Sequence, residues 1–125
     1  MKEIISTDKA PAAVGPYSQA IKVNGLLFCS GQIALDPASG ALAGSDVKAQ
    51  TEQVMKNISA VLAASGATFD DVIKTTCFLT DINDFAEFNQ IYGAYFTGKP
   101  ARSCVAVSAL PKGALVEVEV VAAIK

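Results

Sequence analysis

Three charged side chains near the carboxyl terminus are of types that could carry chemistry. Arg102, in PARSCVAV (100–107), is the only arginine, because the other basic side chains are nine lysines. Glu117 and Glu119 alternate with valines in LVEVEVVAAI (115–124). A guanidinium can hold a carboxylate through two parallel hydrogen bonds, and a glutamate can act as a general base. From the residues alone, a structural salt bridge between Arg102 and either glutamate is about as good an interpretation.

The chain contains no histidine. This removes the commonest general base, the commonest metal ligand and every nucleophile pair of the Ser-His or Cys-His kind. Cys29, Cys77 and Cys104 lack CxxC spacing, so neither a disulfide framework nor a structural zinc site is indicated. An all-carboxylate site for a hard cation stays open, but the acidic residues are scattered and form no calcium-loop pattern. We therefore expect chemistry without a metal or other cofactor.

Length and charge limit the class of protein. A chain of 125 residues suits a single domain, 1–125. The net charge of −2 and the pI near 5.0 argue against a nucleic-acid partner. The amino terminus has charges and a proline where a signal peptide needs apolar residues, and no later stretch approaches about 18 apolar residues. We expect a cytoplasmic protein without a membrane segment.

The stretch from Asp46 to about Ser65 has the periodicity of a helix. Asp46 or Ser45 can serve as the N-cap, and Gly66 provides a stop. The apolar positions that recur at helical spacing are Val47, Val54, Ile58, Val61 and Leu62.

A second helix is expected to begin at Asp84. The spacing of Asp84 and Glu87 allows a capping box, and Gly98 and Pro100 end the pattern. Its apolar stripe, which we interpret mainly as core, consists of Phe85, Phe88, Tyr92 and Tyr95.

Four runs have the composition of strands. They are GLLFCSGQI (25–33), DVIKTTCFLT (71–80), SCVAVSAL (103–110) and LVEVEVVAAI (115–124). The last two are separated by the turn PKGA (111–114), which predicts an antiparallel pair. The alternation in 71–80 predicts that one face of that strand carries Ile73, Thr75, Cys77 and Leu79, and that the other carries Val72, Lys74, Thr76 and Phe78.

The last strand has one apolar face and one mixed face. Glu117 and Glu119 lie on the mixed face with Leu115 and Val121, and the apolar face carries Val116, Val118, Val120, Ala122 and Ile124. An α+β fold with two helices packed on one face of a mixed sheet of about six strands accounts for the pattern. Because the mixed face is partly apolar, we expect it to contact another subunit of a homo-oligomer.

Four segments together closely resemble the Rid family, the reactive intermediate deaminases also called the YjgF family. They are VGPYSQAI (14–21), SGQI (30–33), PARSCVAV (100–107) and LPKGALVEVE (110–119). The resemblance covers essentially the whole chain and is greatest to the RidA subgroup. It implies a chorismate-mutase-like fold, a homotrimer with one cleft at each subunit interface, and 2-iminobutanoate/2-iminopropanoate deaminase activity. The products would be a 2-keto acid and ammonia, and no cofactor would be needed.

The resemblance also implies roles for individual residues. Arg102 matches the arginine that holds the substrate carboxylate, and Glu117 matches the glutamate that positions the hydrolytic water. Cys104 matches a pocket residue that contributes mainly backbone contacts, and Tyr17 matches a tyrosine lining the cleft. The same matching places near the pocket Ser30, Gly31 and Asn89.

Each residue also has a structural interpretation. Taken alone, Cys104 is a packed strand thiol, and without a histidine base we do not expect it to be a nucleophile. Tyr17 follows Gly15 and Pro16 in a turn, where an aromatic side chain can simply pack on the surface. Glu119 is interpreted as structural. Lys99 stands where many relatives carry an aromatic residue, and we interpret it as exposed loop charge.

Two other classes of function stay open. The same pocket could hold a small carboxylate without converting it, as in a regulatory binding protein. An endoribonuclease activity is attributed to some members of the family, but the chain has no basic or aromatic stretch suited to RNA.

Overall fold

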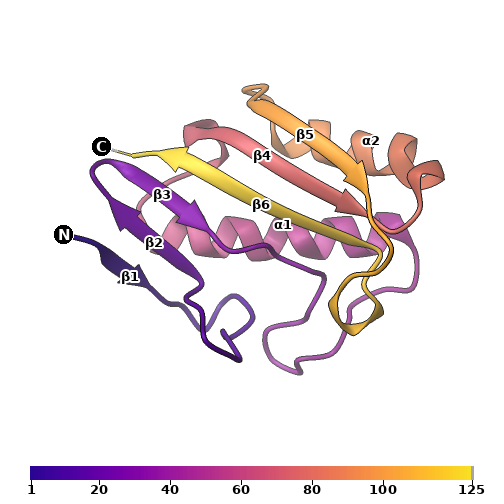
Figure 1. The fold of residues 1–125 in the computed structure, drawn as a ribbon, viewed down its shortest axis with the longest axis horizontal. Helices are drawn as coiled ribbons and strands as arrows, with labels where there is room; N and C mark the ends of the chain where they lie inside the picture. The colour runs from indigo at the N-terminus through magenta and orange to yellow at the C-terminus, as the bar shows by residue number, and fades with distance from the viewer. Residues whose placement is uncertain (125) are drawn as a thin grey trace.

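A computed structural model describes residues 1–124 and shows one six-stranded sheet with two helices behind it (Figure 1). The strand order is β1-β2-β3-β6-β4-β5, and only β4 and β5 run parallel. The predicted α+β architecture, with both helices on one face of a mixed sheet, is confirmed. The strands are β1 (Glu3–Ile5), β2 (Ala20–Val23), β3 (Leu26–Cys29), β4 (Val72–Leu79), β5 (Ala101–Ala106) and β6 (Val116–Ala123), and the helices are α1 (Val47–Ala64) and α2 (Phe85–Tyr95).

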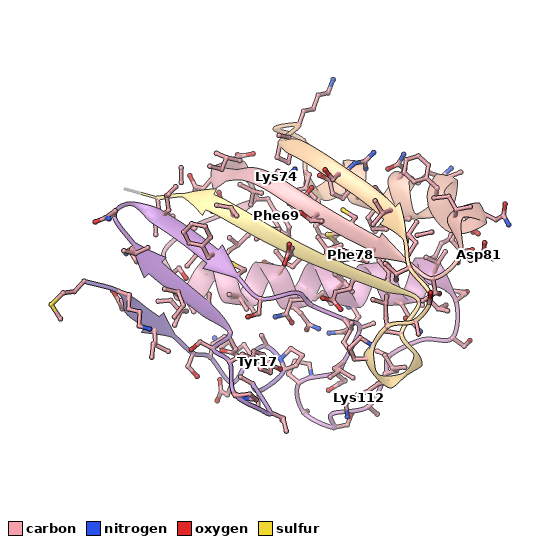
Figure 2. All side chains as sticks on the ribbon, viewed as in Figure 1. Tyr17, Phe69, Lys74, Phe78, Asp81 and Lys112 are labelled. Carbon is pink, nitrogen blue, oxygen red and sulfur yellow. The ribbon has the colours of Figure 1, made fainter. Side chains whose placement is uncertain are left out.

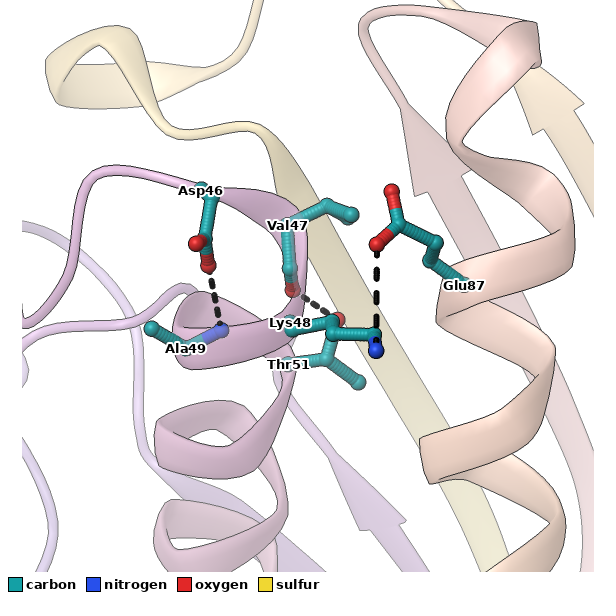
Figure 3. Close-up of polar contacts among 6 residues, drawn as sticks. All are labelled: Asp46, Val47, Lys48, Ala49, Thr51 and Glu87. Carbon is teal, nitrogen blue, oxygen red and sulfur yellow. Dashed lines mark hydrogen bonds and ion pairs between the residues drawn. The ribbon is translucent and has the colours of Figure 1, made fainter.

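Helix α1 follows its apolar periodicity and its cap. The Asp46 side chain accepts a hydrogen bond of 2.8 Å from the Ala49 N–H, so Asp46 is the N-cap (Figure 3). Gly66 ends the helix with φ of 75°, a left-handed conformation that glycine adopts without a Cβ clash. The predicted helix is confirmed, and all of its predicted core positions are buried: Val47, Val54, Ile58, Val61 and Leu62.

Helix α2 is confirmed as an element, but its predicted capping box is wrong. Asp84 already has helical φ and ψ and makes no side-chain capping bond. A 3-10 turn, Ile82–Asp84, precedes the helix instead of the capping box. Asp81 caps this turn by accepting a hydrogen bond from the Asn83 N–H. Glu87 Oε2 instead lies 4.0 Å from Lys48 Nζ of α1 (Figure 3). This ion pair is exposed, so it contributes little to the stability of the fold.

The predicted faces of β4 are wrong at its first two residues. A bulge between Val72 and Lys74 shifts the register against β6, so Val72 is buried and Ile73 is 47% exposed. From Thr75 onward the prediction holds. Thr75, Cys77 and Leu79 are fully buried under the helices.

The last two runs do not form the predicted antiparallel pair. Strand β4 lies between β5 and β6 and pairs with both. Helix α2 carries the chain from the end of β4 back to its start, so β5 runs parallel to β4. Residues 107–115 then cross the end of β4, so that β6 pairs with the other side of β4. Two hydrogen bonds hold this crossing: the Val107 N–H donates to Leu79 O, and the Thr80 N–H donates to Leu115 O.

Strand β6 is the centre of the sheet, and its two faces differ as predicted. Val116, Val118, Val120 and Ala122 are at most 1% exposed and face the helices. The opposite face of the sheet carries Glu117 and Glu119 and is not covered by any element of residues 1–124. Its apolar side chains include Phe28 and Val105, which are 46% and 45% exposed. Contact of this face with another subunit stays a prediction.

Asn57 of α1 fastens the loop that follows β3. Its fully buried amide donates hydrogen bonds of 3.1 and 2.9 Å to the carbonyls of Ile33 and Leu35. Asn57→Leu leaves both carbonyls without these donors, so we expect the free energy of unfolding to fall by about 2–4 kcal/mol. Urea denaturation would measure this, with Ser59→Ala on the exposed face of α1 as the control. A loss below about 1 kcal/mol would contradict this role of Asn57.

Candidate active site

Four of the predicted site residues line one cavity of about 600 Å³, which we call the Glu117 cavity. It lies at the end of the sheet where three loops meet: 11–19, 30–40 and 111–112. Figure 2 shows Tyr17 and Lys112 on two of these loops, which are far apart in sequence and close in space. The walls are mostly apolar, and the predicted residues among them are Tyr17, Ser30, Gly31 and Glu117.

The Glu117 side chain lies directly against the backbone of Gly31. A Cβ atom built at Gly31 would overlap Glu117 Oε2 and would be 2.8 Å from Glu117 Cδ. Any side chain at position 31 would therefore occupy the space of the carboxylate. Gly31 has no left-handed φ, so its role is to leave space rather than to adopt an unusual backbone conformation.

Burial raises the pKa of the Glu117 carboxyl group, and the negative charge of Glu119 raises it further. Glu117 and Glu119 project from the same face of β6 two residues apart, so their charges repel. A carboxyl pKa moved toward neutral makes the carboxylate a stronger base. The cavity thus holds a group suited to removing a proton from water.

Ser30 ties the loop that carries Tyr17 to the end of β3. The Ser30 hydroxyl donates to Ser18 O at 2.6 Å, and the Ser30 N–H donates to Gln19 O at 2.9 Å. The buried Gln19 amide in turn donates to Thr7 O and to Pro11 O. Tyr17 is 54% exposed at the mouth of the cavity. Ser30 therefore positions this wall, and its hydroxyl proton is already used within the protein.

The other predicted site residues form a second group around Arg102 on the edge strand β5. Arg102 Nη1 donates a hydrogen bond of 2.6 Å to Asn89 Oδ1 on α2. Cys104 is half-buried two residues further along the same face of β5. Lys99, in the loop before β5, is exposed, in agreement with its interpretation as loop charge.

Arg102 and Glu117 lie on opposite faces of the sheet. Arg102 is opposite the buried Thr75 in the β4–β5 register, so its side chain points toward α2. Glu117 lies between Val116 and Val118, which face the helices, so its own side chain points the other way. The interpretation of Arg102 as the salt-bridge partner of Glu117 or Glu119 is therefore wrong within one chain. The residues of the Glu117 cavity and the residues around Arg102 also do not meet within one chain.

The thiol of Cys104 is not activated. Burial raises its pKa, and the nearby positive charge of Arg102 opposes this only in part. At neutral pH the group is therefore a protonated thiol rather than a nucleophilic thiolate.

The sequence interpretation missed the aromatic residues around Arg102. The guanidinium carbon of Arg102 lies 4.8 Å from the centre of the Tyr92 ring and 5.4 Å from that of Phe85. Both rings had been assigned to the core. The sequence does contain a signal for this group. Phe85, Asn89 and Tyr92 stand at positions i, i+4 and i+7 of α2, which places all three on the same helical face.

Metal-binding clusters and membrane-spanning helices are both absent from residues 1–124. No group of three or more histidine, cysteine, aspartate or glutamate side chains there is arranged to hold a metal ion. No helix in this part of the chain has the length and apolar character needed to cross a membrane.

Proteins of similar sequence occur in bacteria and in mouse. Residues 7–124 match the family described as "Endoribonuclease L-PSP". The "Putative regulator AldR" of Lactococcus lactis is 56% identical over 124 residues, which cover 98% of each chain. The 2-iminobutanoate/2-iminopropanoate deaminase of Mus musculus is 48% identical over 123 residues, 98% of this chain and 91% of the mouse protein.

Solved structures of similar proteins have the same fold over nearly the whole chain. The crystal structure of the Rid protein YyfA from Yersinia pestis has a TM-score of 0.96 at 55% identity, covering 99% of this chain and 100% of that one. The structure of E. coli TdcF with bound serine has a TM-score of 0.93 at 39% identity, covering 98% and 99%. The match over nearly the whole length, in both sequence and fold, shows that this chain belongs to the Rid (YjgF) family.

Proposed function

We propose that the protein is a 2-iminobutanoate/2-iminopropanoate deaminase, which hydrolyses reactive imines to 2-keto acids and ammonia. The observation that carries the proposal is the Glu117 carboxylate, which lies against Gly31 in a cavity and has a raised pKa. The mouse relative is named for this activity, and the E. coli neighbour was solved with serine, a small amino acid. We place the reaction in the cytoplasm.

A complete site in this proposal needs two copies of the chain. Arg102 points to the helix side of the sheet and Glu117 to the open side, so one copy cannot present both to one small molecule. In a homotrimer, each cleft would combine the Glu117 cavity of one subunit with Arg102, Asn89 and Cys104 of its neighbour. The exposed apolar residues of the open face would be covered in such an assembly.

The mechanism follows from these groups. The Arg102 guanidinium binds the substrate carboxylate through two hydrogen bonds and fixes the adjacent C=N carbon. Glu117 takes a proton from a water molecule as the water oxygen bonds to that carbon, and the C=N π electrons move to nitrogen. Glu117 returns its proton to the nitrogen and the hydroxyl proton is also passed to the nitrogen, so that the C–N bond breaks as the C=O bond forms, releasing ammonia and leaving the 2-keto acid. No cofactor takes part.

The direct test generates a 2-imino acid in situ with an amino-acid oxidase and traps it with semicarbazide. If the proposal is right, purified protein lowers the amount of trapped imine in proportion to its concentration. Unchanged trapping with folded protein would contradict the proposal.

Substitution of Glu119 tests the pH dependence. Removing its negative charge in Glu119→Gln favours the ionised form of Glu117, so the pKa of Glu117 falls and the base survives to lower pH. We expect the acid limb of kcat/KM against pH to move to lower pH than in wild type. Glu3→Gln on the distant strand β1 is the charge-matched control and leaves the limb in place. An unmoved limb in Glu119→Gln, or one moved to higher pH, would show that Glu117 is not the titrating base.

Cys104→Ser tests whether the thiol reacts. Because the Cys104 pKa is raised and the role proposed for this residue is mainly through its backbone, we expect kcat/KM to stay within about tenfold of wild type. The trapping assay on folded protein measures this. Complete loss of turnover would identify Cys104 as a nucleophile, against the mechanism above.

A non-catalytic regulatory protein is the second candidate, because the Lactococcus relative is named as a regulator. The same Arg102 group would then hold a small carboxylate that is not converted. Binding of 2-ketobutanoate together with an unchanged rate of imine trapping would favour this candidate. The family description also names an endoribonuclease, but the net charge of −2 gives little attraction for RNA.

A further inference from the structure

Helix α2 presents three side chains to Arg102 from one face. Phe85 and Tyr92 place their rings within cation–π distance, at 5.4 and 4.8 Å from the guanidinium carbon. Asn89, between them on the helix, accepts a hydrogen bond of 2.6 Å from Nη1. Two aromatic faces and one amide oxygen thus restrict a side chain that otherwise has four rotatable bonds and much conformational freedom.

Tyr92 is itself held in place from the sheet. Its hydroxyl lies 2.7 Å from Thr75 Oγ1, and Thr75 is fully buried at the position of β4 that is opposite Arg102. Burial raises the pKa of Tyr92, so its hydroxyl stays protonated and can share this hydrogen bond. A ring needed only for packing would require no hydroxyl, and a fully buried threonine without a partner would be costly.

We propose that Phe85, Asn89 and Tyr92, with Thr75 anchoring Tyr92, form a positioning device that holds the Arg102 guanidinium ready for the substrate carboxylate. The role of Arg102 rests on the proposed function, but the positioning does not. Within residues 1–124 Asn89 takes one of the five guanidinium N–H groups, which leaves the other four for a ligand. Preorganisation by the device means that binding does not have to order the arginine.

The single arginine makes the device measurable without any assay of function. Protein labelled with ¹⁵N-arginine has one guanidinium Nε–Hε signal, which belongs to Arg102. Two nearby rings should displace this signal from the position of free arginine. In Tyr92→Leu the signal is expected to move toward the free-arginine position and to exchange faster with water. Tyr92→Phe keeps the ring and is expected to keep most of the displacement.

The matched control is Tyr95→Leu. Tyr95 lies on the same helix but donates its hydroxyl to Glu52 rather than contacting Arg102. Tyr95→Leu therefore removes packing from α2 without removing a ring from Arg102. We expect it to leave the Arg102 signal unchanged. Phe85→Leu, at a half-buried position, is the milder variant if Tyr92→Leu does not fold.

Kinetics provide the second readout. We expect Tyr92→Leu to lower kcat/KM by about 10- to 100-fold with a severalfold rise in KM, because a mobile guanidinium holds the carboxylate poorly. Loss of folded protein alone would lower kcat and leave KM unchanged. Tyr92→Phe should restore most of the activity relative to Tyr92→Leu.

The two hypotheses fail separately. An Arg102 signal that is the same in wild type, Tyr92→Leu and Phe85→Leu would overturn the positioning device, whatever the activity. A wild type that shows the displaced signal but does not hydrolyse imines would leave the device standing and contradict the deaminase.

Discussion

Arg102→Lys is expected to lower kcat/KM for 2-imino acids by about 100-fold or more, although the positive charge is kept. Lysine offers a point charge in place of the planar fork, so the carboxylate can turn and the C=N carbon is no longer fixed relative to the water. Lysine also lacks the planar guanidinium group, whose carbon lies over the rings of Phe85 and Tyr92. The semicarbazide trapping assay, run over a range of imine concentrations, measures the loss.

Lys99→Ala is the control for Arg102→Lys. Lys99 is an exposed cation three residues before Arg102, so it tests whether general positive charge near the site matters. We expect this variant to keep its rate within about twofold of wild type. An Arg102→Lys protein with near-normal turnover would show that bidentate binding of the carboxylate is not required.

Gly31→Ala is expected to lower kcat/KM by about 100-fold while the protein stays folded. The added Cβ would overlap Glu117 Oε2, so the carboxylate must leave its place in the cavity. The clash is with the end of a flexible side chain and the backbone of Gly31 is not left-handed, so the fold can tolerate the change. Thermal denaturation and the trapping assay together separate the two effects.

Gly93→Ala provides the matched control for Gly31→Ala. Gly93 lies within α2, and a Cβ there meets nothing within 4 Å. Alanine at this position should raise the free energy of unfolding by about 0.5–1 kcal/mol and leave kcat/KM unchanged. If Gly31→Ala were as active as Gly93→Ala, the observed place of the Glu117 carboxylate would not be the catalytic one.

Periodicity in the sequence predicted the elements best where one face is continuously buried. Helix α1 and strand β6 follow their apolar patterns along their whole length, because each packs one stripe or face against the core. The β4 bulge could not be predicted, because the register shift at Val72 depends on pairing with β6, which lies 44 or more residues away in the chain. The place of β5 was missed because the short turn before β6 favours a hairpin, whereas α2 returns the chain to a parallel position beside β4.

The candidate site was predicted by residue type and resemblance rather than by geometry. Alternation along β6 put Glu117 on the mixed face, but the face of Arg102 depends on its register with Thr75. The roles of Phe85 and Tyr92 were hidden for a similar reason. An aromatic stripe on a helix is typical of core, and only the position of β5 brings a guanidinium against it.

Subunit complementation can show whether Arg102 of one subunit and Glu117 of another form one site. Arg102→Ala and Glu117→Gln chains, each with a different affinity tag, would be co-expressed and the mixed assemblies purified through both tags. Either composition of a mixed trimer contains one junction with an intact Arg102 and an intact Glu117.

We expect each variant alone to be inactive and the mixed trimers to recover about one third of the wild-type rate of imine hydrolysis. If both residues acted within one chain, every chain in the mixture would carry a defect. Mixed trimers as inactive as their parents, next to an active wild type purified in the same way, would therefore contradict the intersubunit site.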